Sequence, residues 1–414
     1  MTRYLLPITG LLLSVASLLI GHGLQLTLIP LRGELLGWSA TEIGITGSTY
    51  FLGFVVGCLV IPRTIAQVGH IRTFAVLAAL ATAVILLVEL SNSLALWLLL
   101  RFTTGCSLSG LYMVIESWLN EKSPNELRGA ILSLYAMLTM VAIAGGQLFL
   151  GASSPADATL FMVASLFMCL SILPVGLTRS TAPQPVHEVH FRPRQLFRTS
   201  QVSVVAALLG GMVTGSFWAL GPLYASSRNL TPENVGLFMT AVILGGAALQ
   251  FPLGRLSDRL DRRVVILGVT SCGAAATLAM WWFTPDGSDW LFALAFLFGA
   301  TSMPLYALCV AHANDNISDS TFVETASGIL MMNSIGSVLG PTVAAPLMSL
   351  FGSSAMFAFA TLAHLVSAIW CLVRLRAHTV ERGHYQPFAS LPKTTQGAID
   401  LDPRTEPDVA PADP

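Results

Sequence analysis

Long apolar runs are the feature of this sequence that most constrains its fold. About twelve of them follow one another along the 414 residues, and each is close to the roughly 20 apolar residues that one helical bilayer crossing needs. Only 10% of residues are charged, against roughly 25% in soluble domains, so there is too little polar surface for a water-soluble globule. The runs are continuous rather than alternating, which favours helices over a barrel. We predict an all-α membrane protein with spans near 5–30, 42–62, 73–91, 94–120, 129–151, 158–178, 201–226, 234–254, 264–284, 288–313, 324–350 and 354–376.

Basic residues are concentrated in alternate connections between these runs. Positive charge marks the cytoplasmic face of a membrane protein, so we predict that these connections and both chain ends are cytoplasmic. Only Arg32 and Arg228 would then lie on the outer side, with Arg101 inside a span. The cytoplasmic connections would contain Arg63, Arg72, Lys122, Arg128, Arg179, Arg192, Arg194, Arg198, Arg255, Arg259, Arg262 and Arg263, and the chain ends would add Arg3, Arg374, Arg376, Arg382, Lys393 and Arg404.

The two halves of the chain repeat each other. Gly53 recurs as Gly245 at an offset of 192 positions, and Gly105 recurs as Gly299 at an offset of 194. A polar, proline-containing stretch separates the halves, and repeated Pro and Asp make the C-terminal tail a candidate for disorder. We predict two pseudo-symmetric six-helix bundles, 1–178 and 201–376, joined by a cytoplasmic linker, 179–200, and followed by a disordered cytoplasmic tail, 377–414.

One short stretch between two spans is unusually charged. The residues from Gly254 to Arg263, GRLSDRLDRR, carry four arginines and two aspartates. This stretch resembles the G-x-L-x-D-R-x-G-R-R motif of the major facilitator superfamily, a family of membrane transporters. At an offset of 192 the first half has an eroded copy, in which Ala66 replaces Asp258 and Gln67 replaces Arg259.

Two further stretches indicate a branch of that family. The sequence GLYMVIESWLNEKSPNELRG, residues 110–129, and AHANDN, residues 311–316, resemble the bacterial YcaD-like branch. The resemblance extends over essentially all of the predicted helices. It implies a multi-pass permease of the bacterial inner membrane and supplies no substrate.

The charged motif suggests a gate. Asp258 is suited to a helix N-terminus, where unpaired N–H groups and the helix dipole favour an anion. By pseudo-symmetry that terminus would be the start of the fifth span. We hypothesise that Asp258, Arg259 and Arg128 form a latch that closes the cytoplasmic side, with Gly254 and Arg255 in the same gate. The alternative is a charged loop with a purely topological role.

Arg101 is the most informative single residue. A charge within a span costs at least ~2.5 kcal/mol unless it is partnered or wetted. With Gly105 it resembles the superfamily's fourth-span R-x-x-x-G motif, whose arginine is often tied to proton coupling or substrate anions. The alternative is an arginine whose side chain extends to the outer surface.

Glu116 follows Arg101 on the same predicted helix. Fifteen residues span about 22 Å, so the two side chains cannot touch, and Glu116 should lie near the cytoplasmic end. It is a candidate proton carrier or, as we favour, a structural partner for Arg255, Arg259 or Arg128 in the gate.

Residues that line a solute pathway are expected on the first, fourth, seventh and tenth spans and their neighbours. Each candidate has the alternative role of packing or of bonding between helices. The candidates are His22, Gln25, Arg101, Tyr112, Gln147, Trp218, Tyr306 and Asn333.

These observations predict a secondary active transporter that moves a small organic solute across the inner membrane by alternating access, coupled to protons. A uniporter of the same fold and a transport-dead sensor or scaffold are the alternatives. The chain contains no HExxH, G-x-S-x-G or P-loop motif, so we expect no enzyme activity, no cofactor and no metal. Expected partners are the solute, protons and membrane lipid, without nucleic acid, and the protein is expected to be a monomer.

Overall fold

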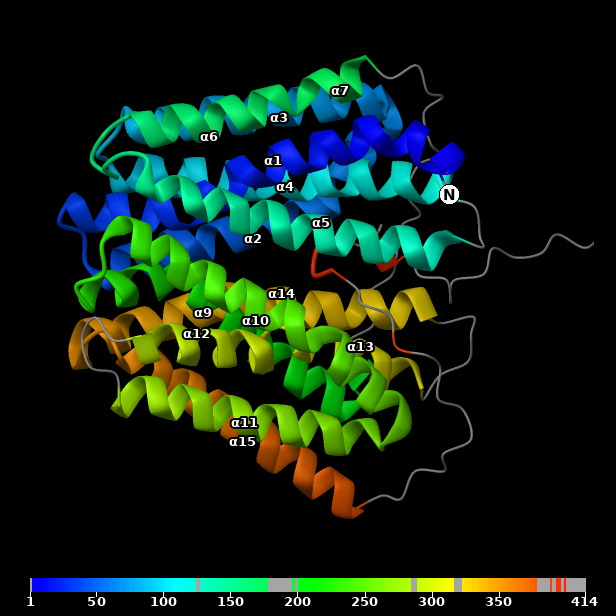
Figure 1. Ribbon diagram of the computed structural model, residues 1–414, viewed down its shortest axis with the longest axis vertical. Coiled ribbons are helices and arrows are strands. Elements are labelled where there is room, and N and C mark those ends of the chain that lie inside the picture. Colours follow the sequence, from blue (N-terminus) through cyan, green and yellow to red (C-terminus); the bar gives the residue numbers. More distant parts are fainter. Residues whose placement is uncertain are drawn as a thin grey trace, which may run out of the picture.

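The computed structural model describes residues 2–123, 127–177, 196–197, 200–283, 289–315, 322–377, 388, 392–395 and 398–399 (Figure 1). Side chains of residues 2–8 and 322 are outside this description. So are Arg179, Arg192, Arg194, Arg198, Arg382 and Arg404, whose predicted cytoplasmic position therefore stays a prediction.

The first half of the chain folds into six membrane-length segments. Each begins and ends close to a predicted apolar run, and the sixth consists of two helices, α6 and α7. The elements are α1 (Thr2–Leu35), α2 (Ala40–Val68), α3 (His70–Glu89), α4 (Leu94–Lys122), α5 (Arg128–Leu148), the 3₁₀ turn η2 (Phe149–Gly151), α6 (Thr159–Leu170) and α7 (Ile172–Gly176).

The second half repeats this plan with six more segments, and the tenth is broken into two helices at Met303–Pro304. Proline lacks a backbone N–H and clashes with the preceding turn, which accounts for the break. The elements are α9 (Gln201–Ser227), α10 (Pro232–Arg259), α11 (Arg262–Trp282), α12 (Asp289–Ser302), α13 (Leu305–Asn314), α14 (Phe322–Phe351) and α15 (Ala355–Ala377).

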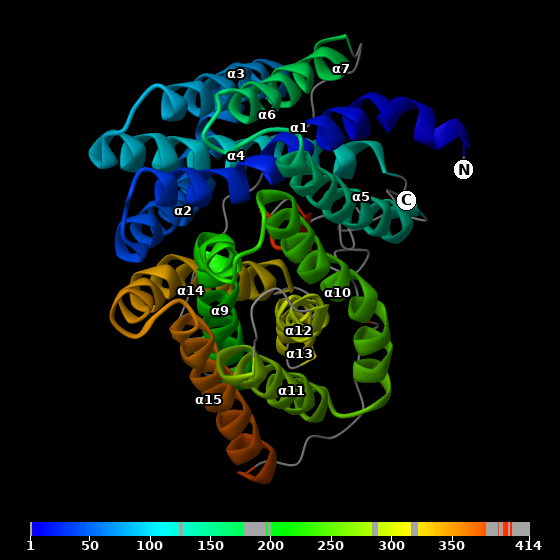
Figure 2. The ribbon, with the colours of Figure 1, turned by 60° about the vertical axis from the view of Figure 1, so that its left-hand side comes forward.

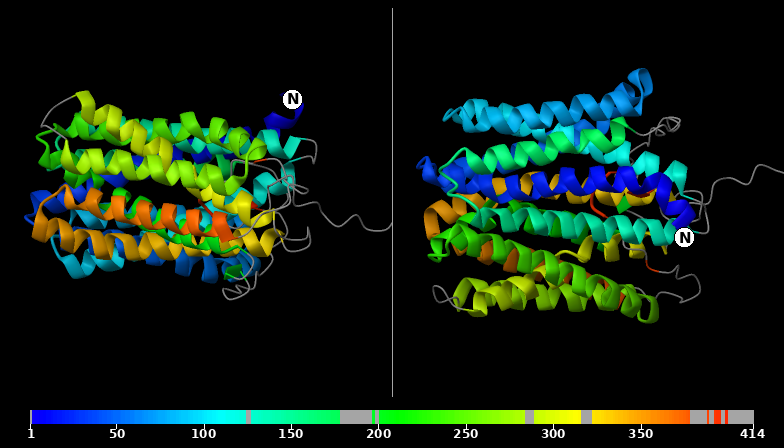
Figure 3. Two further views of the ribbon diagram at one scale, coloured as in Figure 1. Left: turned by 90° about the horizontal axis from the view of Figure 1, so that it is seen from below. Right: turned by 45° about the horizontal axis from the view of Figure 1, so that its top comes forward.

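The two halves lie side by side as separate bundles. In Figures 1 and 2, α1–α7 form the upper bundle and α9–α15 the lower one, and both views of Figure 3 show the long helices running across the molecule in roughly the same direction. In the part of the chain that the structure describes, twelve helical segments are long and apolar enough to cross a membrane. The predicted all-α fold of two pseudo-symmetric six-helix bundles is confirmed.

The repeat is visible in how the helices begin and cross. Ser39 caps α2 and Thr231 caps α10, each with its side-chain oxygen on a backbone N–H three residues on. Within each bundle the second and fourth spans cross at a pair of glycines. A Cβ on Gly105, or on Gly299 in the other bundle, would collide with a carbonyl oxygen of the facing helix. The offsets found in the sequence therefore mark equivalent backbone crossings.

The outer surface of the bundles is strongly apolar. Leu59, Leu99, Val141, Met162 and Ile369 are each 60% or more exposed. Apolar side chains at this exposure along long helices require a lipid environment rather than water. The chain is therefore a multi-pass membrane protein.

The bundles meet directly at one end. We call the end where α2 joins α3 and α10 joins α11 the basic end, because it contains Arg72 and Arg259. At the opposite end a Cβ on Gly44 of α2 would collide with Ala345 of α14, and Gly236 of α10 packs in the same way on the Gln147 carbonyl of α5. These two contacts are related by the repeat, and they hold the bundles together at the opposite end.

At the basic end, residues of the C-terminal tail lie between the bundles, where Figures 1 and 2 show red segments. We define the tail segment as the described residues 388, 392–395, 398 and 399. Thr395 is 1% exposed and Ile399 is 1% exposed. The expectation of a disordered tail thus differs from what the structure shows at these positions, because polar composition does not reveal partners inside the bundle.

The helix crossings give a stability prediction. Gly299→Ala places a Cβ against the Val242 carbonyl oxygen, whereas Gly268→Ala has no heavy atom within 4 Å of the added carbon. Overpacking of this kind costs about 1–3 kcal/mol, while alanine in an open helix position favours the helix by roughly 0.5–1 kcal/mol. We expect a lower melting temperature in detergent for Gly299→Ala and an equal or higher one for Gly268→Ala. Equal melting temperatures for both variants would contradict the close approach of the two helices at Gly299.

Candidate functional site

A cavity of about 240 Å³ lies between the two bundles. Both bundles contribute to its wall, which includes five Phe, Tyr or Trp side chains. The lining includes His22, Tyr50, Phe51, Phe54, Tyr112 and Thr139 from the first bundle, Thr214, Trp218, Gln250, Met303, Asn333 and Ser334 from the second, and Pro392, Lys393 and Thr394 from the tail segment.

A polar cluster forms the wall of this cavity on the first bundle. His22 is buried, with Nδ1 2.8 Å from the Gln25 amide nitrogen and Nε2 3.3 Å from the Tyr50 hydroxyl. Gln25 lies one turn along α1 and is itself buried, so it orients the imidazole ring. His22 is thus at the cavity wall as predicted, while Gln25 lies behind it.

Arg101 completes this cluster from α4. Its guanidinium carbon is 4.5 Å from the centre of the Tyr50 ring, a cation–π contact. The residue is only 5% exposed, so its side chain does not extend to the outer surface. Among the described residues, Nε and Nη1 of Arg101 have no hydrogen-bond partner. The cluster therefore contains a buried guanidinium with N–H groups available to a ligand, next to a titratable imidazole.

Glu116 lies on the same helix, toward the basic end, and is fully buried. Its carboxylate accepts a hydrogen bond of 3.0 Å from the Tyr135 hydroxyl and hydrogen bonds from the hydroxyls of Thr394 and Thr395. The favoured prediction of an arginine partner is wrong in this structure. The tail segment supplies the donors instead, so the carboxylate faces hydroxyl groups rather than the charged motif.

The other predicted pathway residues divide into two groups. Tyr112, Trp218 and Asn333 line the cavity. Tyr306 is buried beside it, where its ring faces the Lys393 ammonium nitrogen at 5.9 Å.

Gln147 belongs to neither group. It donates from its amide nitrogen to the Gly23 carbonyl at 2.8 Å and accepts from the Thr27 hydroxyl at 2.5 Å. It therefore bonds α5 to α1, which is the structural alternative stated for it.

Lys393 is a site residue that sequence reasoning missed. Its ammonium nitrogen has no hydrogen-bond partner among the described residues. Burial lowers the pKa of Lys393 to about 8. No sequence pattern indicated this role, because Lys393 follows a proline in a polar tail of the kind that is usually solvent-exposed.

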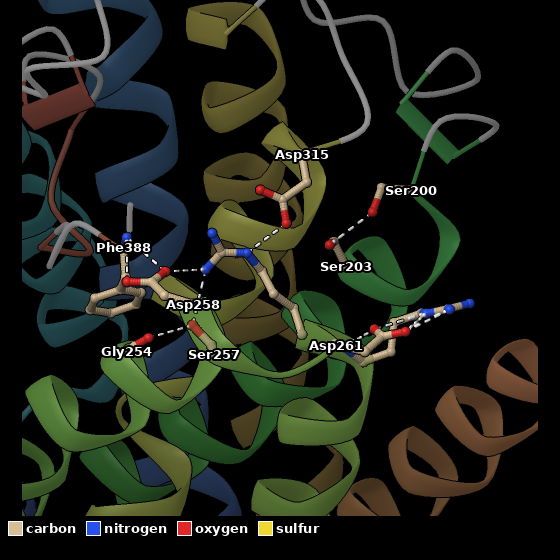
Figure 4. A network of polar contacts seen from close by, with 10 residues as sticks. Ser200, Ser203, Gly254, Ser257, Asp258, Asp261, Asp315 and Phe388 are labelled. Carbon is tan, nitrogen blue, oxygen red and sulfur yellow. Dashed lines mark hydrogen bonds and ion pairs between the residues drawn. The ribbon is translucent and has the colours of Figure 1, made fainter. Parts of the chain in front are cut away.

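Asp258 of the charged motif does not contact α5 in this structure. Its carboxylate is 3.2 Å from the Arg262 guanidinium and accepts the backbone N–H of Phe388 at 2.9 and 3.1 Å (Figure 4). Arg259 and Arg255 are exposed, and α5 begins at Arg128. The proposed latch of Asp258 with Arg128 is thus not formed here, and the carboxylate contacts Arg262 and a tail residue instead.

Arg262 is the central cation of this motif, and the sequence did not single it out. It is fully buried, with Nε 2.5 Å from the Asp315 carboxylate and Nη1 2.9 Å from the Ser257 hydroxyl. Asp315 follows α13 in the AHAND stretch, so that stretch was the available signal. The ion pair links the start of α11 to the end of α13.

Arg263 makes the neighbouring ion pair with Asp261, at 2.7 Å. Asp261 caps α11 and accepts the Arg263 backbone N–H at 2.9 Å. Burial raises the pKa of Asp261, but the hydrogen bonds from Arg263 outweigh it and hold the pKa below its usual value. The motif therefore fixes the turn between α10 and α11 through its acids.

Two six-helix bundles around a shared, aromatic-lined cavity define this protein as a membrane solute transporter. The Major Facilitator Superfamily model matches residues 11–232 and again residues 203–394, one match for each half. The chain belongs to that superfamily, as the charged motif and the repeat predicted.

Two curated relatives come from bacteria. An uncharacterized MFS-type transporter of Yersinia enterocolitica is 27% identical over 86% of this chain and 93% of the relative. The uncharacterized MFS-type transporter YcaD of Escherichia fergusonii is 27% identical over 91% of this chain and 97% of the relative. The predicted resemblance to the YcaD-like branch is confirmed.

Solved structures share the fold. The nucleoside transporter NupG superposes with a TM-score of 0.74 at 11% identity, covering 91% of this chain and all of NupG. A bacterial homologue of the lysosomal transporter Spinster, in an inward-facing and occupied conformation, superposes with a TM-score of 0.72 at 14% identity, covering 92% and 98% of the two chains.

The Arg262–Asp315 pair gives the second prediction. Asp315→Asn leaves a fully buried arginine without its closest carboxylate, and loss of one partner of a buried pair costs about 3–5 kcal/mol. We expect a clearly lower melting temperature than for Asp289→Asn, which removes an exposed carboxylate of the same kind at the start of α12. Equal melting temperatures for the two variants would show that the Arg262–Asp315 pair does not stabilise the fold.

Proposed function

We propose that this protein is a secondary active transporter that moves a small organic solute across the bacterial inner membrane by alternating access. The observation that carries the proposal is the cavity between two bundles that touch directly at the opposite end and are separated by the tail segment at the basic end. Rocking of one bundle against the other around a fixed site would expose this cavity to each side in turn. The basic end is assigned to the cytoplasm on its arginines.

The size and chemistry of the wall support a small organic solute. A volume of about 240 Å³ is near the lower limit of roughly 300 Å³ for ligand pockets, and Phe51, Phe54 and Trp218 supply flat apolar surfaces. His22 and Asn333 add a few polar groups that would fix orientation. A bare Ca²⁺ or Mg²⁺ ion would need a wall of oxygen ligands instead.

Coupling to protons is the second part of the proposal. His22 and Glu116 are buried titratable groups, and Arg101 is a buried cation close to His22. Ionisable groups inside a span are costly and mark substrate or proton pathways. Uniport is the alternative, and solute flux that is unchanged when the proton gradient is collapsed would favour it.

Alternating access is tested by locking the opposite end. The hydroxyls of Thr41 on α2 and Ser349 on α14 are 3.0 Å apart, so cysteines at both positions can form a disulfide across the bundles. The six native cysteines are replaced first. A solute is chosen by screening nucleosides, sugars, amino acids and organic acids for thermal stabilisation of the purified protein.

We expect the oxidised double-cysteine variant to lose solute counterflow in proteoliposomes and to regain it on reduction, because the opposite end can no longer open. Each single-cysteine variant serves as the control and should be unaffected by oxidation. Full flux through the disulfide-locked protein would exclude alternating access. A stabilising solute without flux in any variant would favour a transport-dead sensor.

Coupling is tested at Arg101. Lysine keeps the charge but lacks the planar guanidinium that stacks on Tyr50. We expect Arg101→Lys to reduce solute-driven proton movement about tenfold, equivalent to about 1.4 kcal/mol, as reported by a pH dye inside proteoliposomes. Arg72→Lys, an exposed substitution of the same kind, should match the unaltered protein. Unchanged proton movement in Arg101→Lys would remove Arg101 from the coupling mechanism.

A further inference from the structure

The tail segment contacts both bundles at the basic end of the cavity. Its threonines Thr394 and Thr395 donate to Glu116 in α4 of the first bundle. The backbone N–H of Phe388 donates to both carboxylate oxygens of Asp258 in α10 of the second bundle, at 2.9 and 3.1 Å. The tail segment thus donates hydrogen bonds to one acidic residue in each half of the chain.

Side-chain packing makes this contact specific. The Phe388 ring lies directly against Gly254, where a Cβ would overlap the ring carbons. Lys393 faces the Tyr306 ring at 5.9 Å, and it lines the cavity together with Pro392 and Thr394. The glycine of the charged motif therefore leaves room for an aromatic ring of the tail.

Burial shows that the tail residues are part of the packed interior. Thr394 is 6% exposed, and both Ala398 and Ile399 are at or below 1%. Glu116 is fully buried, and a buried carboxylate without hydrogen-bond donors is costly. Two of its three hydroxyl donors come from the tail segment, so withdrawal of the tail would leave this acid facing an open cavity.

We propose that Glu116, Tyr306, Gly254 and Asp258 form a peptide-binding site whose ligand is the chain's own tail segment, and that its occupancy blocks the cavity from the basic end. The ligand that this site takes is a peptide with an aromatic residue and, five positions further on, a lysine followed directly by two hydroxyl side chains. The bundles contact each other directly at the opposite end, so the bound segment lies across the end where they do not.

Access to the cavity tests this proposal without a transported solute. Ser334 lines the cavity, so Ser334→Cys in the full chain with its six native cysteines replaced gives one reporter thiol. The labelling rate with a polar maleimide is measured in detergent. We expect Thr394→Val with Thr395→Val, which removes both hydroxyl donors at nearly constant volume, to raise this rate about tenfold. Gly254→Leu, which displaces the Phe388 ring from the receptor side, should raise it as well.

Two controls separate release of the tail from general loosening. Thr342→Val is an exposed substitution on α14 and should leave the rate unchanged. A synthetic peptide of residues 386–399 should slow the labelling of the double-valine variant, whereas the same peptide with valine at 394 and 395 should not. Labelling rates that are equal in all variants, or insensitive to the peptide, would overturn the proposal.

The effect on flux rests on the proposed transport function. If the tail blocks the cavity, solute flux should rise in the double-valine variant along with labelling. Faster labelling without flux in any variant would refute transport and leave the peptide site standing. Faster flux with unchanged labelling would refute the peptide site and leave transport standing.

Discussion

The absence of water from the bilayer core is the constraint on which this structure depends. Every backbone polar group there must be satisfied within a helix, so the chain has few places for a charge. Most of the described arginines lie at helix ends, as at Arg259 and Arg32, and the fully buried Arg262 is paired with carboxylates. Two further buried charged groups, Arg101 and Glu116, lie beside the cavity between the bundles, where partners other than lipid are available. The same constraint that dictates the helices therefore also places these two charges next to the cavity rather than against lipid.

Most of the fold could be predicted from the sequence for this reason. Apolar runs of bilayer length leave little choice of secondary structure, and the repeat offsets at Gly53 and Gly105 identify helix crossings that tolerate only glycine. Residues that face the cavity were predictable where a polar or aromatic side chain lies on a central span, as for His22 and Trp218. Gln147 has the same sequence character but bonds two helices together, and only the facing direction of α5 distinguishes the two roles.

Partner choice at the basic end could not be predicted. The sequence showed that Asp258 and Glu116 would lie near this end, and it offered arginines as the obvious counter-charges. In the structure Asp258 pairs with Arg262 and accepts the Phe388 backbone N–H. Glu116 accepts hydrogen bonds from hydroxyl groups. A backbone N–H carries no sequence signal, and threonines in a polar tail resemble those of any disordered segment. The partners of Asp258 and Glu116 at the basic end are therefore groups that leave little recognisable pattern in the sequence.

The charged motif gains a different meaning from this arrangement. Its copy in the first half has Ala66 in place of an aspartate, so among the described residues the acid of this motif that contacts the tail belongs to the second bundle. The acid of the first bundle, Glu116, comes from the interior of α4 instead. The tail segment therefore bridges two acids at different depths, one in each bundle. Any rocking motion that brings the bundles together at the basic end would remove the space that the tail occupies. The tail cannot be bound while this end is closed. Binding of the tail would therefore favour the arrangement in which the bundles are apart at the basic end.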